Sequence, residues 1–188
     1  LKATRLPKPV LVVGNRIVGG AGKTPATIAI LQHLKAQGWH PGVLTRGYKA
    51  EASQHPRPLL LDASSQDQLT VQDTGDEPLL LWRRTHVPVM IDPQRARGGQ
   101  AMLKRHPEIN ILVCDDGLQH LALSRDIEVI VFDERGQGNG WLLPSGPMRE
   151  PLNTPKIPGL VAPPIVLYNA SQPSTHLPGH CAKRATAP

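Results

Sequence analysis

Residues 10–24 combine the residue types that bind a phosphate group; they read V-L-V-V-G-N-R-I-V-G-G-A-G-K-T. The apolar run Val10–Val13 predicts a buried strand of a parallel sheet, and Lys23 and Thr24 open a segment with helical spacing. Four small residues form the turn between them: Gly19, Gly20, Ala21 and Gly22. Backbone N–H groups of such a turn can approach an anion, and the lysine adds positive charge. We therefore predict a nucleotide phosphate-binding loop, in which Ile17 replaces the glycine of the general pattern.

Two adjacent carboxylates, Asp115 and Asp116, follow the apolar run Ile109–Cys114. In a parallel sheet the carboxyl ends of the strands share one edge, which places this pair near Lys23. Mg²⁺ prefers one or two carboxylates together with phosphate oxygens and a hydroxyl such as that of Thr24. We expect one member of the pair to bind metal. The residues themselves do not decide which one, and a simple turn after a strand is the alternative.

Two further residues could act in proton transfer or phosphate contact. Asp76, in Gly75-Asp76-Glu77-Pro78, could accept a hydroxyl proton during phosphoryl transfer, or could cap the helix that follows. His120 could orient a carboxylate or contact phosphate, although a packed or surface histidine is the default interpretation.

Three arginines lie in a turn or next to a strand end, where a guanidinium group can bind phosphate with two hydrogen bonds. They are Arg46, Arg95 and Arg149. Solvated surface positions are the alternative for each of them.

The elements that must position these residues alternate between strand and helix. Helical patterns cover Lys23–Gly38, Gly75–Arg84 and Arg95–Arg105; strand patterns cover Pro41–Thr45, Leu59–Leu61, Val87–Ile91, Ile109–Cys114, Ile127–Phe132 and Ile165–Tyr168. This alternation predicts an α/β fold with a doubly wound, mostly parallel sheet of the P-loop NTPase-like class. We expect residues 1–169 to form the core domain and residues 170–188 to be a disordered tail or the start of a second lobe.

Composition restricts the partners. The 188 residues carry a net charge of +6 and only 3% aromatic residues. The positive charge suits anionic partners, whereas the scarcity of aromatic residues argues against single-stranded nucleic acid bound by base stacking. No apolar run approaches the ~18 residues of a membrane span, and there is no signal peptide. The first residue is leucine and not methionine, so the natural start of the protein is compatible with a position upstream. A membrane anchor upstream is also compatible with this sequence.

Several segments together resemble the tetraacyldisaccharide 4'-kinases, the lipid A 4'-kinases of Gram-negative bacteria. The matching segments are Val12–Asn15, Val18–Pro25, Arg46–Tyr48, Gly75–Pro78, Asp115–His120, Gly138–Gly140 and Leu143–Glu150. They occur in the family's order, and Asp-Asp-Gly-Leu-Gln-His after such a loop is highly specific. The resemblance implies that ATP, with Mg²⁺, phosphorylates the 4'-hydroxyl of a lipid disaccharide 1-phosphate. It also implies peripheral contact with the cytoplasmic face of the inner membrane; protein partners stay unknown.

The resemblance implies roles for individual residues. Lys23 and Thr24 would serve the ATP phosphates and Mg²⁺, and Asp76 would activate the hydroxyl. Asp115 and Asp116 would organise the metal and the active site. The remaining residues would surround the phosphates, the metal and the sugar: Arg46, Tyr48, Arg95, His120, Arg149 and Glu150, with Glu150 assigned as a metal ligand.

The sequence departs from the family at Ile17, where the family has a small hydroxyl residue, and at Lys49-Ala50, which replaces a glycine pair. The family's second lobe and its N-terminal hydrophobic segment are not within these 188 residues. Two alternatives therefore stay open. One is a nucleotide-dependent ATPase or GTPase switch, against which Val18 argues because such switches commonly place lysine there. The other is a nucleotide-binding fragment without catalytic activity.

Overall fold

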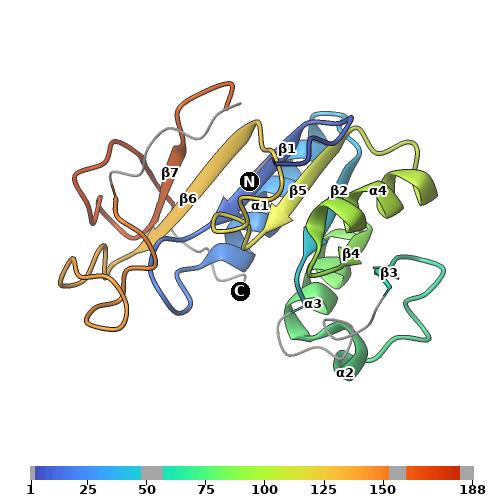
Figure 1. Ribbon diagram of the computed structural model, residues 1–188, viewed down its shortest axis with the longest axis horizontal. Helices are drawn as coiled ribbons and strands as arrows, with labels where there is room; N and C mark the ends of the chain where they lie inside the picture. The colour runs from blue at the N-terminus through green and yellow to red at the C-terminus, as the bar shows by residue number, and fades with distance from the viewer. Residues whose placement is uncertain (1–2, 48–56, 153–159, 183–188) are drawn as a thin grey trace.

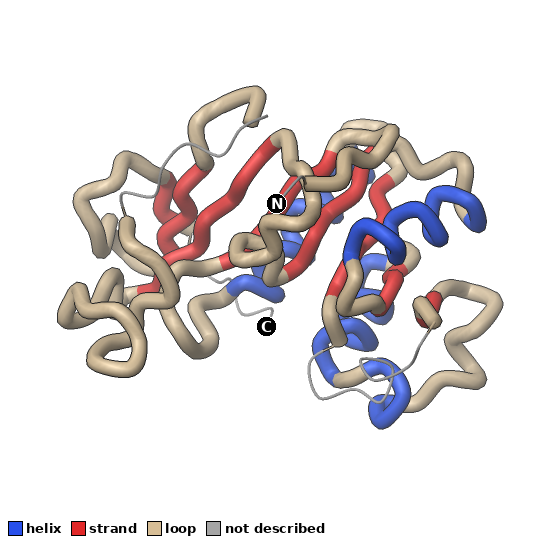
Figure 2. Tube along the Cα trace, in the orientation of Figure 1, coloured by secondary structure: helices blue, strands red, loops and turns tan. Residues whose placement is uncertain are grey.

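The computed structural model describes residues 3–47, 57–152 and 160–182. Within them, eight strands form one sheet: β1 (Val10–Gly14), β2 (Pro41–Thr45), β3 (Leu59–Leu61), β4 (Val89–Ile91), β5 (Ile111–Asp115), β6 (Ile127–Asp133), β7 (Ile165–Asn169) and β8 (His180–Cys181). The helices are α1 (Lys23–Ala36), α2 (Val71–Thr74), α3 (Asp76–Thr85) and α4 (Arg95–Arg105). The helices lie around β1, β2, β4 and β5, whereas long loops surround β6 and β7 (Figures 1 and 2).

The sheet has the strand order β3-β4-β2-β5-β1-β6-β7-β8. The pairing of β3 with β4 is antiparallel, and the other pairs of neighbouring strands are parallel. The predicted α/β class with a mostly parallel sheet is confirmed. Because β1 lies between β5 and β6, the loop after β1 has the ends of both strands beside it.

Two apolar layers cover the two faces of the sheet. Along β1, Val10 and Val12 face the layer that contains Met102 of α4, whereas Leu11 and Val13 face the layer that contains Leu31 of α1. Residues of α3, including Trp82, complete the second layer. Side chains of a strand alternate between the two faces of the sheet. Because apolar layers cover both faces here, the continuous apolar run of β1 is buried throughout.

Several boundaries differ from the sequence prediction. The strand expected over 109–114 is Ile111–Asp115, so Asp115 belongs to the sheet and is 1% exposed. A short helix, α2, was not expected; Thr70 and Asp73 cap it with reciprocal side-chain hydrogen bonds. The suggested capping role of Asp76 is wrong, because Gly75 is the N-cap residue of α3 and Asp76 is the first helical residue. Past residue 169, β8 pairs with β7.

Candidate phosphate-transfer site

The loop between β1 and α1 has the backbone conformation that its glycines permit. Gly19 and Gly22 have φ angles of +90° and +88°, which L side chains rarely adopt. A Cβ atom on Gly22 would also lie 2.6 Å from Nδ2 of Asn169, at the end of β7. Gly22 is the N-cap residue of α1 and no side chain caps the helix, so its first N–H groups are directed at the loop. This arrangement suits an anion.

Asn15 holds the loop and its lysine together. Its Oδ1 accepts a hydrogen bond from Lys23 Nζ at 3.1 Å, and its Nδ2 donates to the carbonyl oxygen of Gly19 at 3.2 Å. Its own carbonyl oxygen accepts a hydrogen bond from Nε2 of Gln119 at 3.3 Å. Asn15 is fully buried. Asn15 is not among the site residues predicted from the sequence, although an amide directly after a buried strand is a usable signal.

Asp115 ends β5 beside the loop, paired in register with Val13. Thr27, on α1, donates its hydroxyl hydrogen to Asp115 Oδ1 at 2.7 Å. Burial raises the pKa of Asp115 to about 6; the bond from Thr27 works against this rise, and the charges of Glu77 and Asp116 add to it. A cation bound at this carboxylate would favour its ionised form.

Asp116 turns away from the sheet with a φ angle of +49°. Its Oδ1 lies 3.5 Å from Lys23 Nζ and accepts a hydrogen bond from Arg149 Nη1 at 3.2 Å. Arg95, the first residue of α4, donates to the carbonyl oxygen of Asp116 at 3.2 Å. Thus three of the sequence-predicted residues, Lys23, Arg95 and Arg149, meet at this aspartate.

The donor set at this edge suits Mg²⁺ better than a transition metal. Asp115 and Asp116 offer carboxylate oxygens and Thr24, in the first turn of α1, offers a hydroxyl. Across residues 3–47, 57–152 and 160–182, no cluster of three or more His, Cys, Asp or Glu side chains could hold a metal ion. One or two carboxylates are enough where phosphate and water supply the other ligands.

Residues 147–150 lie directly against the phosphate loop. The N–H of Val18 donates to the carbonyl oxygen of Pro147 at 2.8 Å, and the N–H of Arg149 donates to the carbonyl oxygen of Arg16 at 2.7 Å. Ile17 and Met148 form an antiparallel bridge between these bonds and pack with Ala21 in a small apolar cluster. Ile17 therefore faces Met148 and is 1% exposed.

Glu150 is bound by groups other than the two aspartates. Its Oε1 lies 3.4 Å from Nε of Arg16 and 3.5 Å from Nε2 of Gln119. Gln119 also accepts a hydrogen bond from Arg149 at 3.4 Å. Glu150 thus contacts the site through the cation of Arg16 and the amide of Gln119. Of the two carboxylates predicted as metal ligands, Asp115 and Glu150, the geometry favours Asp115.

Arg125 anchors the loop that carries His120. This arginine, with a side chain 1% exposed, pairs with Glu128 at 2.9 Å and donates to the carbonyl oxygens of Leu118 and His120 at 2.8 and 2.9 Å. Burial lowers the pKa of the His120 imidazole, and the charges of Arg95 and Arg125 lower it further. These effects favour the neutral imidazole at neutral pH.

The other predicted residues lie as follows. Asp76 and Glu77 are exposed at the start of α3, and the charge of Glu77 helps to raise the pKa of Asp115. Arg46 is exposed after β2. Tyr48 lies outside the described residues.

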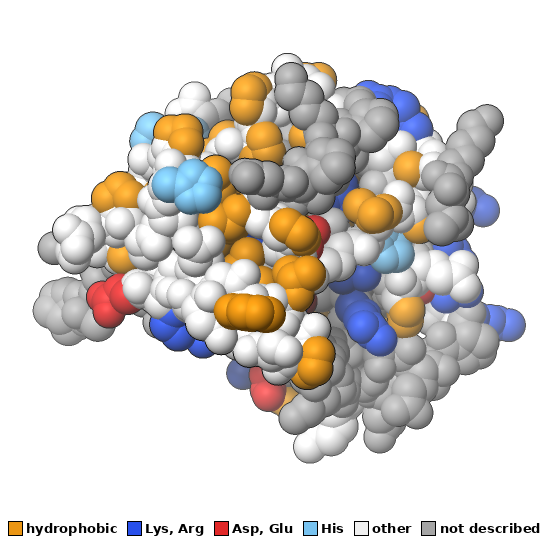
Figure 3. Space-filling model, turned by 60° about the vertical axis from the view of Figure 1, so that its left-hand side comes forward, with side chains coloured by type: hydrophobic (Ala, Val, Ile, Leu, Met, Phe, Trp, Pro, Cys, Tyr) orange, Lys and Arg blue, Asp and Glu red, His pale blue; other side chains and the backbone are white. Residues whose placement is uncertain are grey.

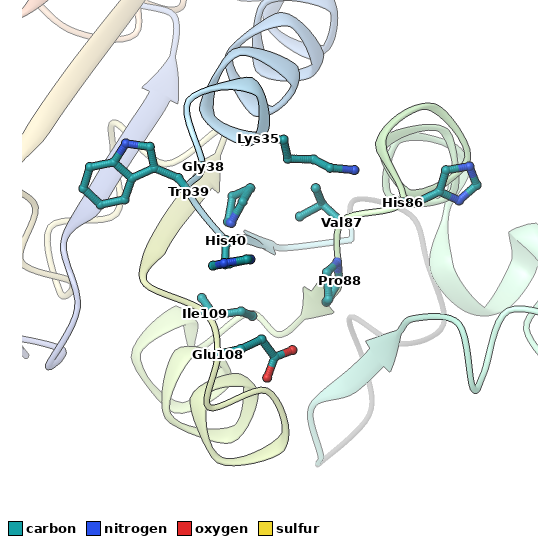
Figure 4. A pocket seen from close by; sticks show the side chains of 10 residues that line it. Lys35, Gly38, Trp39, His40, His86, Val87, Pro88, Glu108 and Ile109 are labelled. Atoms are coloured by element: carbon teal, nitrogen blue, oxygen red, sulfur yellow. The ribbon is translucent and has the colours of Figure 1, made fainter.

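A separate pocket lies at the opposite edge of the sheet, where α1 ends and β2 begins (Figure 4). Its lining includes Lys35, Trp39, His40 and Glu108, and none of the predicted site residues. Lys35 Nζ donates to the carbonyl oxygen of Thr85 at 2.7 Å, and Trp39 points away from Val87 and Pro88. The phosphate loop is therefore the better candidate site.

Residues 1–172 match the family described as tetraacyldisaccharide-1-P 4'-kinase, LpxK. This chain belongs to that family. Among similar curated members, the tetraacyldisaccharide 4'-kinase of Leptothrix cholodnii is 54% identical over 99% of this chain and 50% of its own length. That of Methylibium petroleiphilum is 51% identical over 98% of this chain and 49% of its own.

A solved structure of a family member has the same fold. The crystal structure of LpxK from Aquifex aeolicus in complex with ATP matches with a TM-score of 0.74 and 30% identity, over 89% of this chain and 50% of that chain. The chain thus spans about half the length of the family members it matches. Within the described residues, no helix has the length and apolar character needed to cross a membrane.

Proposed function

We propose that this chain carries the nucleotide-binding and phosphate-transfer residues of a kinase that moves the γ-phosphate of ATP to the 4'-hydroxyl of a tetraacyldisaccharide 1-phosphate. Membership of the tetraacyldisaccharide-1-P 4'-kinase family supports the substrate class. The observation that carries the proposal is the meeting of Lys23, Arg149 and Asp116 beside the phosphate loop, with Nζ of Lys23 3.5 Å from Oδ1 of Asp116. Cations at this point can receive the charge of a transferring phosphoryl group.

Nucleotide binding falls to the loop and its helix. Backbone N–H groups of the loop and of the first turn of α1 would bind phosphate oxygens, and Asn15 holds Lys23 beside the loop. Mg²⁺, when bound, would neutralise phosphate charge, with Thr24 and Asp115 as its protein ligands. Arg95 keeps Asp116 in place through its carbonyl oxygen. We assign Arg46 and Tyr48 as outer contacts to the phosphates.

Proton removal from the acceptor hydroxyl is assigned to Asp76. A general base must reach the hydroxyl, and exposure at the first turn of α3 leaves the Asp76 carboxylate accessible to a substrate. The charge of Glu77, its neighbour, acts on Asp115, which supports a position for this helix end near the proposed metal ligand. His120, as a neutral imidazole, would contact phosphate or orient a carboxylate.

We infer that residues 1–169 supply the kinase core, and β8 adds a short strand to its sheet beside β7. The acylated substrate implies peripheral contact with the cytoplasmic face of the inner membrane. No nucleic acid partner is proposed.

Transfer of radiolabelled phosphate from ATP to tetraacyldisaccharide 1-phosphate tests the function. The assay is run with this chain alone and with the chain inside a polypeptide of its relatives' full length, and ATP affinity is measured in parallel. We expect Mg²⁺-dependent labelling of the lipid by the longer form. ATP hydrolysis or nucleotide-dependent dimerisation without lipid labelling would instead support a switch protein. Transfer by the short chain would refute the inactive-fragment alternative.

A further inference from the structure

A guanidinium group lies against the phosphate loop on the side of β6. Arg135 follows the end of β6, and its Nη1 and Nη2 atoms lie 3.3 and 3.5 Å from the position that a Cβ atom on Gly19 would occupy. The missing side chain of Gly19 thus leaves room for this group. Figure 3, in which the side of the molecule with β6 and β7 comes forward, shows basic side chains at the surface of this face. The Arg135 side chain is 53% exposed, so a ligand from solvent can reach it.

Asp133, the last residue of β6, holds the guanidinium group in place. Its Oδ2 accepts hydrogen bonds from Nε of Arg135 at 2.9 Å and from Nη2 at 2.7 Å, and its Oδ1 accepts one from the backbone N–H of Arg135 at 3.0 Å. No acceptor within the described residues forms a hydrogen bond with Nη1, the guanidinium atom nearest to Gly19. The side chain thus presents a fixed and unused donor at the loop, which lowers the entropic cost of binding an anion there.

Backbone contacts fix the turn that carries Arg135. The N–H of Gly136 donates to the carbonyl oxygen of Asp133 at 3.1 Å, and the N–H of Gly138 donates to that of Arg135 at 2.8 Å. Ser174, which lies beyond β7, donates its hydroxyl hydrogen to the carbonyl oxygen of Asp133 at 2.7 Å. The approach of the guanidinium group to the loop is therefore set by the fold and not only by a free side chain.

The two sides of the phosphate loop carry different groups. Because β1 lies between β5 and β6, the residues that follow these two strands flank the loop from opposite sides. On the β5 side, Asp116 contacts Lys23 and Arg149, and the proposed transfer takes place there. On the β6 side, Arg135 supplies a cation. A nucleoside triphosphate carries further phosphates besides the one that is transferred, and these also need cationic partners.

We propose that Arg135 binds, through Nη1, a phosphate that stays with the nucleotide after the transfer. This inference rests on the nucleotide-binding part of the proposed function, because it takes a nucleoside triphosphate as the ligand. It adds to the loop a binding residue from a different strand end. ATP and ADP both contain the phosphate concerned, so Arg135 contributes to the affinity for both nucleotides.

Calorimetry with ATP and with ADP tests the inference, on this chain and on the full-length form of the kinase assay. The test variant is Arg135→Met, which removes the charge and keeps an unbranched side chain, and Arg135→Lys keeps the charge. The matched control is Arg5→Met. The Arg5 side chain is 62% exposed and also pairs with an aspartate, Asp126, at 2.6 Å, but Asp126 lies at the other end of β6. Thermal unfolding verifies that the variants fold.

We expect Arg135→Met to raise the Kd for ATP and the Kd for ADP by about tenfold each, and Arg135→Lys to recover part of this loss. Lipid labelling at low ATP should fall by a similar factor, and at saturating ATP by less than about twofold, because the phosphate concerned is not transferred. Arg5→Met should keep both Kd values. Unchanged Kd values for Arg135→Met would overturn the inference. A loss confined to ATP would also overturn it, since Arg135 would then bind the transferred phosphate.

The kinase assay separates the failure of this inference from that of the proposed function. If the lipid is labelled but Arg135→Met binds both nucleotides as the unchanged chain does, Arg135 only stabilises its turn and the proposed function stands. If Arg135→Met weakens the binding of both nucleotides but the unchanged full-length form labels no lipid, the inference stands and the proposed transfer fails.

Discussion

Oδ1 of Asn15 accepts a hydrogen bond from Nζ of Lys23 at 3.1 Å, which fixes the lysine at the mouth of the phosphate loop. The same side chain donates to the carbonyl oxygen of Gly19, so one buried amide orders both the cation and the turn. Preorganised donors cost little to align when the anion arrives.

Replacing Asn15 with alanine should therefore weaken nucleotide binding. We expect the Kd for ATP to rise about tenfold, which corresponds to ~1.4 kcal/mol. Isothermal titration calorimetry measures the change. Asn110→Ala is the matched control, because Oδ1 of Asn110 accepts a hydrogen bond from the backbone N–H of His40 at the opposite edge of the sheet. An unchanged Kd for Asn15→Ala would show that Lys23 needs no such support.

Asp76→Asn keeps the size of the side chain and removes its basicity. If Asp76 accepts the hydroxyl proton, the rate of lipid phosphorylation should fall by about a hundredfold or more, with little change in the Kd for ATP. Single-turnover labelling and calorimetry separate the two quantities in the full-length form. The control is Asp67→Asn, at an exposed turn. Equal losses of turnover and ATP binding would remove Asp76 from the role of base.

Arg125→Met should destabilise the fold by about 3–5 kcal/mol, because it leaves the buried Glu128 carboxylate without its partner. Urea unfolding measures the loss. The double variant Arg125→Met/Glu128→Met should recover much of it, since no unpaired charge is then buried. NMR titration adds an independent test: without the Arg125 charge, the pKa of His120 should rise toward its ordinary value. A milder cost for the single variant than for the double would contradict this account.

The contact between His106 and Asp62 should make stability depend on pH. Burial opposes protonation of His106, but its hydrogen bonds to Glu108 and Asp62 outweigh burial and raise its pKa above 6.5. A raised histidine pKa stabilises the fold below that value, and the stabilisation is lost as the pH rises through the folded-state pKa. His106→Gln should thus cost more at pH 5.5 than at pH 8.5, by less than about 1 kcal/mol because the site is partly solvated. Denaturation at both pH values measures this cost, with the exposed His33→Gln as control; an equal cost at both would refute the coupling.

Local patterns were sufficient to predict the central sheet, since the run at 10–13 is apolar without interruption and the run at 127–132 is interrupted only by Glu128, and both are mostly buried. They also placed Lys23 and Asp115 at one edge, because parallel strands end together. The role of Ile17 depends on a contact across the chain, and that of Arg125 on how the loop before it folds back. Ile17 looked like a lost polar contact in the loop, yet its environment is set by Met148, 131 positions later. Nothing in the local sequence of Arg125 reveals that it holds the carbonyl oxygens of Leu118 and His120.

The bridge between Ile17 and Met148 also has a thermodynamic consequence. Met148 bonds to Trp141 and Leu143 on one side, and its neighbours Pro147 and Arg149 bond to the phosphate loop on the other, so one short stretch of backbone connects the two loops. Binding linkage is reciprocal: whatever factor ATP imposes on the affinity for the acylated disaccharide, the disaccharide must impose on the affinity for ATP. The order in which the two ligands arrive then has no effect on the stability of the complex that holds both.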